Sequence, residues 1–159
     1  MYRIMFVCHG NICRSPMAEF ILKKLVAEKG LEDLFIISSS ATSDEEIYMG
    51  RGNPVYPSAK RELARHGISC EGKRAVQLKF EDYENYDYFV CMDSANYRRT
   101  LQILKGDKKC KVRKLLSYAK ILGDVADPWY TYRFDKTYDD ILKGCVALLD
   151  YLLSKGEKD

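Results

Sequence analysis

The residues best suited to chemistry form one run near the N-terminus, Cys8-His9-Gly10-Asn11-Ile12-Cys13-Arg14-Ser15-Pro16. A short apolar run, Ile4 to Val7, precedes it, and a segment with helical spacing of apolar residues follows it. This pattern predicts a tight loop between a buried strand and a helix. We expect Ser15 to cap that helix and Pro16 to occupy its first turn.

A loop in this position can hold an oxyanion such as phosphate. The N-terminus of a helix carries unpaired backbone N–H groups and partial positive charge. Cys8 would lie at the base of the cradle, where these groups and Arg14 favour its thiolate form, and Arg14 can bind two phosphate oxygens at once. Gly10 lets the backbone fold back closely, and Asn11 tolerates a left-handed conformation. The predicted phosphate-binding loop consists of His9, Gly10, Asn11, Ile12, Cys13 and Arg14.

Length and composition indicate one soluble domain covering residues 1–159. The net charge of +3 is too small to indicate a nucleic-acid partner, and a local anion site would account for it equally well. No secretory signal is present, and no apolar run approaches the roughly 20 residues that a membrane span needs. These features predict a cytoplasmic protein without nucleic-acid or membrane partners, in a compartment that keeps a reactive thiol reduced.

Cysteine spacing argues against a metal site. The six cysteines do not form two Cys-x2-Cys units, which zinc sites typically use, so we expect neither a metal nor a cofactor. Apart from the two cysteines of the loop we interpret them as structural residues: Cys70, Cys91, Cys110 and Cys145.

Strand-like and helix-like segments alternate along the whole chain. Strands are predicted at about 2–7, 34–38 and 86–92, with a fourth starting near 112, and helices at 15–29, 58–66, after Asp93 or Ser94, and from 138 to 152. Segments 39–52 and 124–133 are predicted to be loops. Alternation favours an α/β fold with a four-stranded parallel sheet and helices on both faces. Ligands bind such sheets at the carboxyl ends of the strands, where Cys8 and Asp93 fall.

Several stretches resemble the low-molecular-weight protein tyrosine phosphatase family, and the resemblance runs nearly end to end. The stretches are 7–19 around the loop, Ser39-Ser40-Ala41-Thr42-Ser43, His66-Gly67-Ile68, Cys91-Met92-Asp93 and Asp127-Pro128-Trp129-Tyr130. The resemblance implies a small parallel sheet wrapped by helices, a phosphotyrosine-containing protein as substrate and inorganic phosphate as product.

The resemblance also implies a mechanism. Cys8 would attack phosphorus while Arg14 holds the oxygens, and Asp127 would protonate the leaving tyrosine oxygen and later activate water. Cys8, Arg14 and Asp127 are thus the expected catalytic residues. By resemblance, Cys13 could form a disulfide with the nucleophile under peroxide and protect it.

Supporting and substrate-contacting residues are implied in the same way. Ser15 resembles a hydroxyl that hydrogen-bonds the thiolate, and Asn11, Ser39 and His66 resemble a network that fixes the loop. The expected substrate slot consists of Ile12, Trp129 and Tyr130, the aromatic residues stacking on the phosphotyrosine ring. The chain departs from the common family pattern at Tyr132, where glycine is frequent, and in segment 44–52, which by resemblance is a variable loop at the rim of the slot.

Four alternatives remain at this point. Related protein-arginine phosphatases resemble the loop but carry threonine at the position of Ile12. Thiol-linked arsenate reductases share the fold but need a close pair of resolving cysteines, which Cys70 and Cys91 do not form in the sequence. A phosphopeptide-binding module would have lost Cys8 or Asp127. A redox sensor built on Cys8 and Cys13 is compatible with catalysis.

Overall fold

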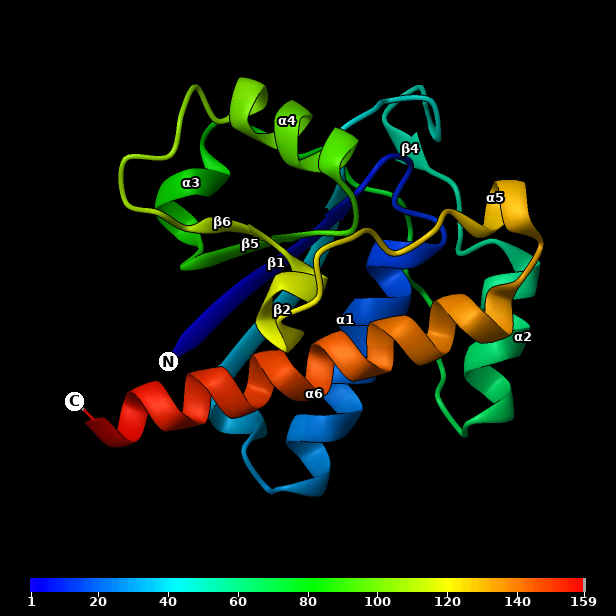
Figure 1. The fold of residues 1–159 in the computed structure, drawn as a ribbon. Coiled ribbons are helices and arrows are strands. Elements are labelled where there is room, and N and C mark those ends of the chain that lie inside the picture. The colour runs from blue at the N-terminus through cyan, green and yellow to red at the C-terminus, as the bar shows by residue number, and fades with distance from the viewer. Residues whose placement is uncertain (159) are drawn as a thin grey trace.

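A four-stranded parallel sheet forms the centre of the computed structural model, which describes residues 1–158 (Figure 1). The strands follow the order β2-β1-β5-β6, and all pairs are parallel. Their bounds are β1 (Tyr2–Cys8), β2 (Phe35–Ala41), β5 (Tyr88–Cys91) and β6 (Val112–Lys114). The predicted single α/β domain with this sheet is therefore confirmed; Asp159, its last predicted residue, lies outside the described residues.

Helices cover both faces of the sheet, as predicted (Figure 1). Helix α1 (Arg14–Glu28) packs on β1 and β2 and against α6 (Phe134–Lys158), which also contacts α2 (Pro57–Arg65). Helix α4 (Ser94–Ile103) covers β5 and β6 from the other side. The remaining short elements are η1 (Glu32–Leu34), α3 (Asp82–Asn85), η2 (Leu115–Ala119), α5 (Pro128–Thr131) and the hairpin strands β3 (Ile47–Tyr48) and β4 (Arg51–Gly52). No helix of residues 1–158 is long and apolar enough to cross a membrane.

Strand β1 determines which way the first cysteine points. Successive side chains of a strand face opposite sides of the sheet. Ile4, Phe6 and Cys8 belong to the core under α1 and α6, whereas Met5 and Val7 pack in the smaller core under α4. Cys8 is the last residue of β1, so its sulfur emerges at the carboxyl edge of the sheet on the side of α1.

Three predicted elements need correction. Segment 39–52 is not a loop throughout, because β2 continues to Ala41 and the hairpin β3–β4 follows. Segment 124–133 contains α5, which Asp127 caps. Ser15 does not cap α1, which starts one residue earlier at Arg14 and has no side-chain cap. Its hydroxyl faces the Cys8 sulfur instead.

Candidate active site

Polar groups of the loop between β1 and α1 surround the sulfur of Cys8. The hydroxyl of Ser15 lies 3.0 Å from Cys8 Sγ. The backbone N–H groups of Asn11 and Ser15 donate to the same sulfur at 3.3 and 3.4 Å. Both N–H groups can only donate, so the sulfur accepts two hydrogen bonds from the backbone of the loop. The start of α1 adds the partial positive charge of a helix N-terminus.

The side chain of Asn11 fixes the shape of this loop. Asn11 is buried and left-handed, with φ of 59°. Its amide nitrogen donates to Ser15 Oγ at 2.7 Å and to Ser39 Oγ at 2.9 Å, and its amide oxygen accepts from the backbone N–H of Val76 at 3.0 Å. The loop is thus tied both to β2 and to the segment before α3. Every member of such a buried network matters, because an unsatisfied polar group is costly there.

Beneath the loop, the network continues to a largely buried ion pair between Glu19 and Lys73. Ser39 Oγ donates to Glu19 Oε1 at 2.6 Å, and Glu19 is only 5% exposed. Lys73 Nζ lies 3.6 Å from the same oxygen and donates to the carbonyl of Ser39 at 3.0 Å. Burial lowers the pKa of Lys73 from its usual range, although Glu19 opposes the shift. Hydrogen bonds thus run without a break from Glu19 through Ser39, Asn11 and Ser15 to Cys8.

His66 does not take part in this network, contrary to the expectation from the resemblance. It is the exposed C-cap residue of α2, and its ring stacks on Tyr138 with the centroids 3.8 Å apart. Its carbonyl accepts a hydrogen bond from Lys24. Among the described residues, Lys73 is the basic side chain that contacts Ser39. A lysine in a polar stretch gives no periodic signal, so the sequence pattern did not reveal it.

Arg14 connects the loop with two other segments of the chain. Its guanidinium is 3% exposed, donates to Asp93 Oδ2 at 2.8 Å and to the carbonyl of Val125 at 2.8 Å, and lies 3.6 Å from Asp127 Oδ2. Burial alone would lower the pKa of Arg14. The negative charges of Cys8, Asp93 and Asp127 outweigh that effect and raise the pKa, so Arg14 stays charged.

Asp93 and Asp127 are placed by their own backbone surroundings. Asp93 follows β5, caps α4 by accepting from the N–H of Asn96, and anchors Arg14 with its other oxygen. Asp127 caps α5 by accepting from the N–H of Trp129 at 3.0 Å, and Pro128 occupies the first position of that helix. This arrangement leaves the second carboxylate oxygen of Asp127 facing Arg14. The sequence had placed Asp93 at this edge of the sheet and as one of two candidates to cap the following helix, which is confirmed, but it did not predict the contact with Arg14.

A pocket of about 310 Å³ opens above the Cys8 loop and joins these groups. Ile12, Trp129 and Tyr130, the expected slot residues, all line it. Glu45 and Glu46, from the variable segment 44–52, form a further wall, and Glu45 lies 3.1 Å from His9 Nε2. The full lining consists of Cys8, His9, Gly10, Ile12, Cys13, Arg14, Glu45, Glu46, Asp127, Trp129 and Tyr130. Cys8 and Asp127 thus border one shared space, although 118 positions separate their sequence numbers 8 and 127.

The second cysteine of the loop differs from the first. Cys13 is a free thiol at 8% exposure, and burial together with the charge of Cys8 raises its pKa to about 12. Burial likewise raises the pKa of Cys91 to about 12. Cys70 and Cys145 are also buried, whereas Cys110 is exposed. Among the side chains that the structure describes, no group of three or more His, Cys, Asp or Glu is arranged to hold a metal ion.

Comparison with known proteins agrees with this geometry. The model of the family described as "Low molecular weight phosphotyrosine protein phosphatase" matches residues 3–158. The Bacillus subtilis low molecular weight protein-tyrosine-phosphatase YfkJ is 39% identical over 152 residues, which cover 94% of each chain. The crystal structure of YfkJ superposes with a TM-score of 0.87 over 98% of this chain and 96% of YfkJ.

Two further solved structures bear on the substrate. The low molecular weight protein tyrosine phosphatase SP-PTP of Streptococcus pyogenes has a TM-score of 0.84 at 36% identity, covering 96% of this chain and 93% of its own. YwlE, an arginine phosphatase solved as a cysteine-to-serine mutant with a phosphorylated active-site serine, has a TM-score of 0.81 at 25% identity, covering 94% and 95%. The chain therefore resembles phosphatases of two substrate classes.

Proposed function

The chain belongs to the low molecular weight protein tyrosine phosphatase family, and from that premise we propose that it hydrolyses phosphotyrosine in proteins through a phosphorylated Cys8. One observation carries the proposal. The hydrogen-bonded sulfur of Cys8, the guanidinium of Arg14 and the carboxylate of Asp127 all border one pocket large enough for an aryl phosphate.

In the first step, the Cys8 thiolate attacks phosphorus in line with the ester oxygen. An S–P bond forms as the P–O bond to tyrosine breaks, and the carboxyl proton of Asp127 passes to the departing phenolic oxygen. Arg14 and the N–H groups at the start of α1 bind the other phosphate oxygens, where they stabilise the charge of the transition state. This cradle supplies the positive field that a metal ion provides in other phosphatases.

In the second step, water attacks the phosphorus of the phosphocysteine. An O–P bond forms, the S–P bond breaks, and the ionised Asp127 accepts the proton of the water. The products are inorganic phosphate and the Cys8 thiolate. The contacts from Ser15 and Asn11 to the sulfur make the thiolate a better leaving group here and restore it for the next cycle.

Phosphoarginine is the second candidate substrate, because the chain resembles the arginine phosphatase YwlE over most of its length. Ile12 lines the pocket here, and a β-branched aliphatic side chain favours a flat aryl ring by packing against it. Turnover of matched phosphotyrosine and phosphoarginine peptides decides between them. We expect a higher kcat/KM for phosphotyrosine; a higher value for phosphoarginine would contradict the proposed substrate class.

Hydrolysis of an aryl phosphate in the presence of a metal chelator tests the chemistry. The wild-type protein should be active, and Cys8→Ser should be inactive while retaining its fold. The matched control is Cys110→Ser, which changes an exposed cysteine and should leave the rate unchanged. Activity that survives in Cys8→Ser would show that the nucleophile has been assigned to the wrong residue.

A further inference from the structure

Tyr56, just before α2, contacts both halves of the pocket. Its backbone N–H donates to the carbonyl of Ile12 in the Cys8 loop at 2.8 Å. Its ring packs edge-on against Trp129 of α5, with the centroids 5.3 Å apart and the planes at 70°. On another side the ring stacks with Phe134, the first residue of α6, at 6.0 Å and 11°. One residue therefore touches the Cys8 loop, α5 and the start of α6.

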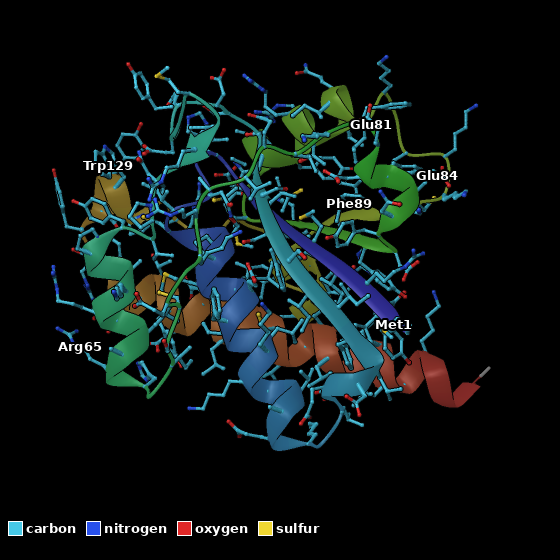
Figure 2. All side chains as sticks on the ribbon, turned by 180° about the vertical axis from the view of Figure 1, so that it is seen from behind. Met1, Arg65, Glu81, Glu84, Phe89 and Trp129 are labelled. Atoms are coloured by element: carbon cyan, nitrogen blue, oxygen red, sulfur yellow. The ribbon has the colours of Figure 1, made fainter. Side chains whose placement is uncertain are left out.

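The proline that follows Tyr56 explains the backbone conformation that allows these contacts. A residue before proline is biased toward an extended backbone, and Tyr56 precedes Pro57 with φ of −57° and ψ of 137°. In this conformation its N–H bonds to Ile12 while its carbonyl accepts from Lys60 in the first turn of α2. The half-buried ring then extends over the main core. Figure 2 shows Trp129 beside the end of α2 that lies opposite Arg65.

Trp129 connects Tyr56 with Asp127, because it contacts both residues. Its backbone N–H donates to Asp127 Oδ1, Trp129 as a whole is 54% exposed, and its ring packs against that of Tyr56. The start of the turn is held separately, by Arg14 at the carbonyl of Val125 and by Thr137 at the carbonyl of Ala126. Tyr56 thus holds the far side of the turn, just after the carboxylate.

We propose that Tyr56 is a positioning residue that sets the placement of Asp127 relative to Cys8 through Trp129. The inference rests on the proposed function, in which Asp127 must reach the leaving oxygen. A small misplacement of a catalytic group is costly, because proton transfer needs hydrogen-bond distance. The hydroxyl of Tyr56 makes no hydrogen bond within the described part of the chain, so the ring alone performs this role.

The test compares two aryl phosphates in Tyr56→Leu. Phenyl phosphate needs a proton on its leaving oxygen, whereas dinitrophenyl phosphate releases an anion that is stable without one. We expect kcat/KM for phenyl phosphate to fall about tenfold to a hundredfold and the value for dinitrophenyl phosphate to change less than threefold. Tyr56→Phe should match wild type on both. Tyr56→Met keeps a flexible apolar side chain against the core but removes the ring contact with Trp129, so it should repeat the loss.

Two further measurements separate positioning from general damage. Trp129 is the single tryptophan of the chain, so its fluorescence reports on α5 alone. Its emission should shift to longer wavelength in Tyr56→Leu and Tyr56→Met. Tyr151→Leu is the matched control, because it removes a ring packed on Tyr118 at 5.3 Å near the other end of α6; it should change neither the emission nor the substrate ratio.

The outcomes distinguish this inference from the proposed function. An equal loss on both substrates, or unchanged Trp129 emission in both ring-deleting variants, would overturn the role of Tyr56. Wild-type protein that hydrolyses neither aryl phosphate would instead refute the proposed function. In that case the emission of Trp129 would still decide whether Tyr56 holds α5.

Discussion

The two sides of the pocket are built differently. The Cys8 loop is buried and tied into a continuous network: Cys8, Asn11, Arg14 and Ser15 are all at most 3% exposed. The turn at 124–133 is largely exposed, with Trp129, Tyr130 and Tyr132 at 54%, 79% and 82%. Charge stabilisation requires fixed dipoles that do not reorganise, whereas substrate contact and proton delivery require access from solvent. The comparison indicates that the more rigid side of the pocket is the Cys8 loop, where the phosphate charge would be held.

The sequence revealed the first side better than the second. Cys8, Asn11 and Arg14 are close in the chain, between a strand and a helix whose periodicities are clear, so their cradle could be predicted. The turn was predicted as irregular, although Asp127 followed by Pro128 is a helix-start signal that could have indicated α5. Strands β3 and β4 have two residues each, too few for a period to be seen.

Contacts between residues that are far apart in the chain could not be predicted from the sequence. Glu19 and Lys73 meet under the loop although a long segment separates them, and nothing local in the sequence marks either as a partner of Ser39. His66 was predicted in that place on resemblance alone, and its position at the exposed end of α2 excludes the contact. Tyr56 was overlooked because one tyrosine among twelve carries no pattern.

The largest expected effect on activity comes from a substitution in the exposed turn 124–133. Asp127→Asn should reduce kcat/KM for phenyl phosphate by roughly 10²–10⁴-fold, which is the usual worth of a general acid. Asp124→Asn is the matched control, because it removes a carboxylate of the same turn that instead pairs with Lys114 and Ser94. Asp124→Asn should lower kcat/KM for phenyl phosphate only slightly. Equal losses in the two variants would mean that the turn as a whole matters rather than the carboxyl group of Asp127.

On the buried side, Asn11→Ala should lower both activity and stability. It removes the two hydrogen bonds that the amide donates to Ser15 and Ser39 and leaves the N–H of Val76 without its partner, so the free energy of unfolding should fall by about 2–3 kcal/mol and kcat at least tenfold. Asn11→Gly loses the same hydrogen bonds but accepts the left-handed backbone at φ 59°.

Chemical denaturation and steady-state kinetics check this pair of variants. Asn11→Gly should be the more stable of the two by about 1 kcal/mol, because it avoids the left-handed strain. Wild-type stability in Asn11→Ala would contradict the view that the loop depends on its network.

The two cysteines of the loop should differ in reactivity. The raised pKa of Cys13, about 12, means that its thiol stays protonated at neutral pH and that its thiolate fraction rises tenfold per unit as pH increases toward that value. Cys8→Ser removes the charge of Cys8 but keeps the burial of Cys13, which is the larger cause of its raised pKa. Alkylation of Cys13 by iodoacetamide in that variant, followed by mass spectrometry, should therefore still be slow at pH 7 and accelerate steadily to pH 9. Fast, pH-independent labelling of Cys13 would contradict its assignment as a buried thiol.

The smallest effect is expected at Tyr132, the left-handed C-cap of α5 with φ of 58°. Tyr132→Gly should raise the free energy of unfolding by about 1 kcal/mol, because glycine adopts this conformation without strain. Tyr130→Gly, inside α5, should lower it. Thermal denaturation measures both, and a loss of stability in Tyr132→Gly would show that the exposed ring contributes more than the backbone strain costs.

The most direct test of the account follows the phosphate itself in Asp127→Asn. With dinitrophenyl phosphate the first step needs no acid, whereas hydrolysis of the phosphocysteine lacks its base. Rapid mixing should therefore give a stoichiometric burst of dinitrophenol, and acid quenching followed by mass spectrometry should find phosphate on Cys8. Absence of a burst, or phosphate on any other residue, would contradict the proposal that Cys8 and Asp127 act in turn on one bound phosphate.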